Sequence, residues 1–193
     1  MVSGCGAAMW RGSPSSSRGY VAATGIYSLC FGKRGELFNS AFGKAAMRLN
    51  VSSIKIRLQK LERYIVELER LQSLTLATFR SDFTAQLAAE RAFQAAIESC
   101  TDVASHVVSV YNLGRPEAQR DLFRLLADAG YLRPAFADTL GDLVALRNRI
   151  VHLYWDTDVE RLYDYLLHDV IYLRQFRDFA LGLLASEEEP PAA

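Results

Sequence analysis

The stretch that decides the fold is residues 52–74, which read SSIKIRLQKLERYIVELERLQSL. Its apolar residues recur at alternating spacings of four and three, namely Ile54, Leu58, Leu61, Ile65 and Leu68. This spacing places them on one face of an α-helix and leaves the charged side chains on the other faces. Ser52 or Ser53 is a suitable N-cap. We therefore predict a long amphipathic helix that packs its apolar face on other helices.

The next part of the chain continues with helical spacing. Residues 75–81 are predicted as a junction or a short helix. Asp82 can cap a second long helix, which ends at the turn over residues 112–114 because Pro116 prevents its return. A third helix is predicted over residues 117–129, where apolar residues again recur at helical spacing.

The last part of the chain supplies two more helices. One begins near Pro134, a residue type that suits the first turn of a helix. The other begins at an S/T-x-x-E capping box formed by Thr157 and Glu160, and we expect it to reach Ala185. No convincing strand alternation is present. The predicted fold class is therefore all-α, an antiparallel helical bundle of about five helices.

Composition excludes several classes of protein. The chain has 193 residues, of which 50% are hydrophobic and 23% charged, and this suits one domain with its own core. No apolar run reaches the ~18 residues of a membrane-spanning helix, so we expect no membrane association. A formal net charge of zero argues against a protein that coats nucleic acid by bulk electrostatics. Three scattered cysteines suggest no disulfide framework, so a reducing, cytoplasmic location is predicted.

The first quarter of the chain differs from the rest. Residues 1–50 carry a net charge of +5 and eight of the 12 glycines, whereas the remainder carries −5. We predict that residues 1–46 are a poorly ordered extension, either artefactual or dispensable, and that Met47 is the natural start. An organellar transit peptide is the alternative, because the segment is poor in acidic residues. A helical domain is predicted over residues 47–185, followed by an acidic, proline-containing tail over residues 186–193.

Residues able to do chemistry gather between the fourth and fifth predicted helices, where residues 146–155 read LRNRIVHLYW. Arg147 can hold a phosphate through its planar guanidinium, and His152 can accept and donate a proton near neutral pH. Asn148, four residues before His152, lies on the same side of the helix and could orient the imidazole. Tyr154 adds a phenolic hydroxyl. The same residues also fit a simpler interpretation, a basic helix end stabilised by the helix dipole.

Helix geometry separates the two main candidates. At ~100° per residue, Arg147 and Tyr154 lie within about 20° of each other, but His152 lies roughly 140° from Arg147. One straight helix therefore cannot easily aim both side chains at the same atom. Either the helix distorts or ends near Ile150, or a second subunit completes the site.

The order Arg147, four residues, His152, one residue, Tyr154 resembles the R-x-x-x-x-H-x-Y signature of HepT-like toxins in the HEPN superfamily. Residues 89–98 and 121–130 also resemble segments typical of that family. The resemblance spans the whole predicted helical domain and leaves the preceding extension unmatched. It therefore implies an HEPN-like fold.

The resemblance also implies an activity. HEPN proteins are all-helical homodimers, and many are metal-independent ribonucleases in which Arg and His of two protomers meet in a cleft. We therefore expect an endoribonuclease without metal or cofactor. Arg147 would stabilise the crowded phosphate, and His152 would transfer protons as RNA is cleaved to a cyclic phosphate and a 5′-hydroxyl.

The resemblance further implies a partner. HepT-like toxins are usually encoded with a minimal nucleotidyltransferase antitoxin, MntA, which can transfer AMP to the motif tyrosine, here Tyr154. Bulk and negative charge added beside His152 would exclude the RNA phosphate. The alternative function is a non-catalytic helical subunit that binds a nucleotidyltransferase or a nucleotide through the same surface.

Other polar residues receive mainly structural interpretations. The acidic residues within 156–158 resemble a carboxylate pair of a metal site, but capping of the fifth helix explains them more simply. His106 is interpreted as a partly buried structural histidine and His168 as a surface residue. Asp102 is either a solvated acid or a residue that orients the catalytic pair. No Cys/His cluster has zinc spacing.

Overall fold

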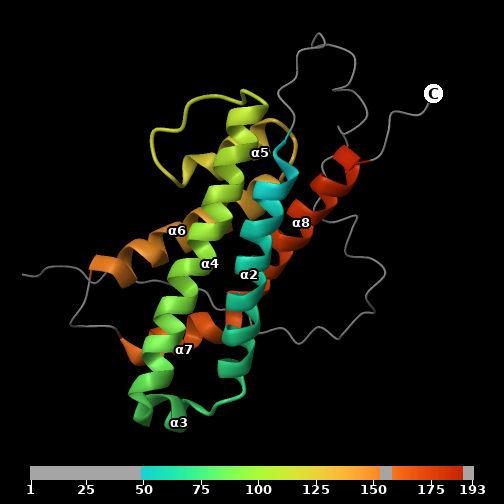
Figure 1. Ribbon diagram of the computed structural model, residues 1–193. Helices are drawn as coiled ribbons and strands as arrows, with labels where there is room; N and C mark the ends of the chain where they lie inside the picture. The colour runs from blue at the N-terminus through green and yellow to red at the C-terminus, as the bar shows by residue number, and fades with distance from the viewer. Residues whose placement is uncertain (1–48, 153–157, 189–193) are drawn as a thin grey trace, which may run out of the picture.

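The computed structural model describes residues 49–152 and 158–188, which form seven helices and no strand. They are α2 (Val51–Gln72), α3 (Leu76–Ser81), α4 (Phe83–Val110), α5 (Asp121–Asp128), α6 (Pro134–His152), α7 (Val159–His168) and α8 (Val170–Glu188). The long helices α2, α4 and α8 pack on one another, while α6 crosses α4 (Figure 1). The predicted all-α class is confirmed. The extension predicted over residues 1–46 lies outside the described residues.

The helix predicted from the opening stretch is confirmed as α2. Its apolar face is buried along the full length of the helix, as Ile54, Leu58, Leu61, Ile65, Leu68 and Leu71. The predicted cap was wrong, because the side chain of Asn50 accepts a hydrogen bond from the Ser53 backbone N–H at 2.9 Å. The helix therefore starts at Val51, so the two serines lie inside its first turn.

Helix α4 begins and ends as predicted. The Asp82 carboxylate accepts from the Ala85 backbone N–H at 3.0 Å, which is the N-cap contact. After Val110 the chain turns through left-handed backbone, with φ of 51° at Asn112 and 135° at Gly114. The next helix, α5, is shorter than predicted and starts at Asp121. The first residues of the helix predicted over 117–129 instead form a separate turn before α5. In this turn the Asp121 carboxylate accepts a hydrogen bond from the backbone N–H of residue 118 at 2.8 Å.

The predicted fifth helix is two helices, α7 and α8, separated at Asp169. Helix α7 is tied to the turn after α2, because the Tyr163 hydroxyl donates to the Leu74 carbonyl at 2.7 Å. Helix α8 instead rises along α2 (Figure 1). The N-cap is Asp158 and not Thr157, since its carboxylate accepts from the N–H groups of residues 160 and 161. Apolar spacing continues across the break and so could not reveal the change of direction.

The acidic tail begins later than predicted. Helix α8 continues past Ala185 to Glu188. The reason is a contact at the end of the bundle, where the Tyr111 hydroxyl donates to Glu187 Oε1 at 2.6 Å. Tyr111 is itself stacked on Tyr131, with ring centroids 5.6 Å apart. In the part of the chain that the structure describes, no helix is both long and apolar enough to cross a membrane.

Candidate nuclease site

Helix α6 carries the motif at its C-terminal end. The first part of the helix is anchored in the core by Phe136, Ala137, Leu140, Leu143, Val144 and Leu146, all buried. The last part projects away from the bundle beyond α4 (Figure 1). From Arg147 onward the described side chains are half-buried or exposed. The sequence therefore places the motif where the helix leaves its own core.

Arg147 and Asn148 contact each other at this end. Arg147 is half-buried, and its Nη1 lies 3.4 Å from Asn148 Oδ1, to which it donates. Within residues 49–152 and 158–188, Arg147 has no carboxylate partner. His152 is the last residue of α6, and its side chain is outside the description, as is Tyr154. The orienting role expected for Asn148 stays a prediction.

Arg149 joins the two helices that flank the segment containing Tyr154. Its Nη2 donates to the hydroxyl of Tyr165 on α7 at 2.7 Å. Its guanidinium carbon also lies 5.7 Å from the centre of the Tyr165 ring, within range of a cation–π contact. This pair was not predicted, because no local spacing links two residues on different helices. It fixes the end of α6 relative to α7 on either side of residues 153–157.

Asp102 lies on α4 and faces α2. Its Oδ2 is 3.7 Å from Nε of Arg57, and both side chains are partly exposed. The Arg57 guanidinium also donates from Nη1 to the Ser53 carbonyl at 3.1 Å. The contacts of Asp102 are thus with α2, and its predicted action on Arg147 or His152 stays untested.

The two other described histidines behave as structural or surface residues, as predicted. His106 is half-buried, and its Nε2 accepts from the Asn50 backbone N–H at 3.1 Å. Burial, together with the positive charge of Arg57, lowers the pKa of His106. His168 is exposed, with Nδ1 3.1 Å from an Asp164 carboxylate oxygen. Among the residues that the structure describes, no group of acidic, histidine or cysteine side chains could hold a metal ion.

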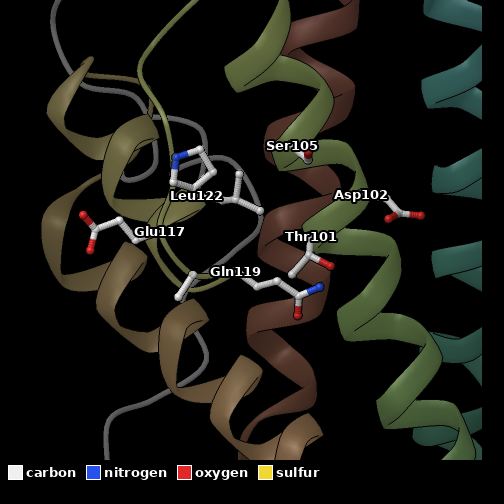
Figure 2. Close-up of a pocket in the computed structure, with 8 residues that line it drawn as sticks. Thr101, Asp102, Ser105, Glu117, Gln119 and Leu122 are labelled. Carbon is white, nitrogen blue, oxygen red and sulfur yellow. The ribbon is translucent and has the colours of Figure 1, made fainter.

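A hollow of about 300 Å³ lies beside Asp102, between α4 and the loop that precedes α5 (Figure 2). Gln119 extends from the loop toward Thr101, while Glu117 and Asp102 stand at its margins. Two carboxylates would repel a phosphate, so the electrostatics do not favour this hollow as the place where an RNA backbone binds.

The fold and the projecting motif define an all-helical domain of the HEPN type. The family model "Ribonuclease HepT-like" matches residues 61–179, and the chain belongs to this family. The match covers every helix from the middle of α2 to the middle of α8. The resemblance seen in the sequence is therefore confirmed.

Characterised relatives agree with this assignment. The chain is 29% identical over 140 residues to the tRNA nuclease HepT of Aphanizomenon flos-aquae, covering 70% of this chain and 93% of that protein. It is 33% identical over 100 residues to the mRNA nuclease HepT of Shewanella oneidensis, covering 52% and 75%. Among solved structures, it resembles the tri-AMPylated Shewanella oneidensis HEPN toxin in complex with MNT antitoxin. The TM-score is 0.63 at 27% identity, over 69% of this chain and 98% of that one.

Proposed function

We propose that this chain is the toxin of a HepT/MntA-type toxin–antitoxin pair, a metal-independent endoribonuclease that acts on RNA in the cytoplasm as a homodimer. The observation that carries the proposal is the end of α6. The chain belongs to the HepT-like ribonuclease family, and at this end Arg147 stands five positions before His152. Among the described residues, Arg147 contacts an amide and no carboxylate. The planar guanidinium of an arginine suits an RNA phosphate.

A second protomer is part of the proposal. Helix α6 continues through His152, so it does not end near Ile150 as one alternative required. In a regular helix the positions of Arg147 and His152 remain about 140° apart. This continuity supports a site in which Arg147 of one protomer meets the histidine of the other. The projection of α6 away from its own bundle supports such an approach (Figure 1).

The proposed reaction needs only these groups. One His152 removes the proton of the ribose 2′-hydroxyl, and that oxygen forms a bond to phosphorus. The bond from phosphorus to the 5′-oxygen breaks, and the second histidine of the dimer donates a proton to the leaving oxygen. Arg147 stabilises the negative charge on the crowded phosphate. The products are a 2′,3′-cyclic phosphate and a fragment with a free 5′-hydroxyl.

Tyr154 is the proposed site of neutralisation. The partner would transfer AMP from ATP, so that the phenolic oxygen bonds to the α-phosphorus and pyrophosphate leaves. The tri-AMPylated state of the Shewanella oneidensis toxin supports this proposal. Intact mass should rise only with an MntA-type partner and ATP, and the rise should be absent in Tyr154→Phe. A rise that persists in Tyr154→Phe would move the modification to another residue.

A mixing experiment tests the shared site. Arg147→Ala and His152→Ala are each expected to lose RNA cleavage in buffer containing a chelator. If the two residues meet across the dimer, co-refolding the two variants creates heterodimers with one facing Arg147–His152 pair but without the second histidine. Cleavage should then return above the level of either variant alone but below about a quarter of the wild-type activity. If each chain used its own pair, no activity would return. Arg63→Ala, an exposed arginine on α2, is the matched control and should cleave normally.

The same assay separates the rival function. Wild-type protein that is unmodified, dimeric and inactive on varied RNAs would contradict the nuclease proposal. It would favour a non-catalytic subunit that binds the nucleotidyltransferase.

A further inference from the structure

One arginine outside the motif lies over the same helix. Arg120 is the residue before α5, and it is exposed. Its Cβ lies 3.8 Å from the position that a Cβ on Gly141 of α6 would occupy. Arg120 therefore lies directly against α6, at a point where that helix has no side chain.

Gly141 shares a stripe of α6 with the end of the motif. Asn148 and His152 follow it by seven and eleven residues, which places both positions within about 20° of Gly141 around the helix axis. Ala145 lies between Gly141 and Asn148 on the same side of the helix, and it is exposed. Arg120 thus lies at one end of this stripe of α6, which leads over about 16 Å to the position of His152.

Because of the direction of α5, Arg120 at its start lies nearer to the motif than Arg124 within it. Arg124, one turn further along α5, lies 3.8 Å from Asp138, which precedes Gly141 on α6. The two helices therefore run antiparallel, and α5 leads away from the motif. Arg124 has a carboxylate partner, whereas Arg120 forms no ion pair within the described residues.

We propose that Arg120 binds a backbone phosphate of the RNA a few nucleotides from the bond that is cleaved. This inference rests on the proposed nuclease function. At the 3.4 Å spacing of a stacked strand, 16 Å corresponds to about five phosphates, and to fewer in an extended strand. At that distance Arg120 is a positioning residue, which contributes to RNA binding and not to bond cleavage.

Binding to RNA that cannot be cleaved tests the contact. A fully 2′-O-methylated 12-nucleotide RNA is titrated with wild type, Arg120→Ala, Arg120→Lys and Arg124→Ala, and anisotropy is followed over a salt series. Arg120→Ala should weaken binding about 3- to 10-fold at low salt and lower the slope of log Kd against log salt by about 0.7. Arg120→Lys should keep the slope. Arg124→Ala should stay within about twofold of wild type.

Cleavage kinetics separate positioning from a structural role. With unmodified RNA, Arg120→Ala should raise KM by the same factor as Kd and leave kcat unchanged. An unchanged salt slope, an equal loss in Arg124→Ala, or a fall in kcat at constant KM would overturn the inference. Wild type that binds RNA but does not cleave it would contradict the proposed function, while the binding series would still decide the role of Arg120.

Discussion

Arginines in the bundle of α2 and α8 have different partners from arginines at the projecting end of α6. Between α2 and α8, Arg177 lies 2.5 Å from Glu62 and 2.7 Å from Asp178, and Arg174 pairs with Glu69. At the end of α6, Arg147 contacts an amide and Arg149 a phenol. Carboxylates neutralise the first set, whereas the partners of the second set among the described residues are neutral. The difference distinguishes arginines that hold helices together through carboxylates from Arg147, which has only an amide contact and is the candidate for binding a phosphate.

The largest expected effect is in the core that supports both regions. Phe176 of α8 is fully buried and meets Phe123 edge to face, with ring centroids 5.7 Å apart. Phe176→Ala should lower the free energy of unfolding by about 3–5 kcal/mol, because it leaves a cavity. Chemical denaturation measures this loss. Phe83→Ala is the matched control, since Phe83 is 69% exposed and should cost less than about 0.5 kcal/mol. Equal losses would mean that the assigned core is wrong.

The second prediction exchanges the two kinds of arginine. Arg177→Ala should lower the free energy of unfolding by about 1.5–3 kcal/mol, because its carboxylate partners lose charged hydrogen bonds. It should leave RNA cleavage intact. Arg147→Ala should do the reverse, costing less than about 0.5 kcal/mol of stability and about 100-fold or more in kcat/KM. Thermal melting and cleavage assays on both variants check the comparison, which fails if Arg147→Ala is the less stable of the two.

Sequence alone predicted the apolar framework well and the breaks in it poorly. The face of α2 and the cap at Asp82 depend on residues within one or two turns, so local spacing was sufficient to find them. The break at Asp169 depends on α7 packing near the turn after α2, and no local signal carries that information.

The roles predicted for Arg147, Asn148 and His152 stay predictions. These residues were singled out from the sequence because they stand within six consecutive residues. The contact between Arg149 and Tyr165 and the position of Arg120 over Gly141 were not, because each joins separate helices. Their partners are defined only once the helices are packed.

A smaller effect concerns the helix that carries the motif. Gly141 lies inside α6, where glycine lowers helix stability by about 0.5–1 kcal/mol relative to alanine. An added methyl group would meet Arg120 Cβ at 3.8 Å, an ordinary van der Waals contact. Gly141→Ala should therefore raise the free energy of unfolding by about 0.5–1 kcal/mol in urea denaturation. A loss of stability would show that α5 lies closer to α6 than this distance indicates.

The smallest expected effect is a dependence of stability on pH at the start of α2, where Asn50 bonds to His106. The folded protein lowers the pKa of His106 through burial and the charge of Arg57, and neutral Nε2 accepts the Asn50 N–H. The unfolded chain therefore binds this proton more readily, and stability should decline as pH falls below the unfolded pKa of about 6.5. Asp102, beside Arg57, offsets part of that positive charge.

His106→Gln removes the titrating group and tests this dependence. Its free energy of unfolding should change less than that of wild type between pH 7.5 and pH 5, as measured by urea denaturation at each pH. His168→Gln, a control at an exposed position that removes the same residue type, should keep the wild-type dependence. Identical pH profiles for wild type and His106→Gln would show that the Asn50 contact does not select the neutral imidazole. In that case protonation of His106 would not weaken the hydrogen bond from the Asn50 N–H to α4 enough to change stability. The contribution of Asn50 to the start of α2 would then come from its side-chain cap on the Ser53 N–H.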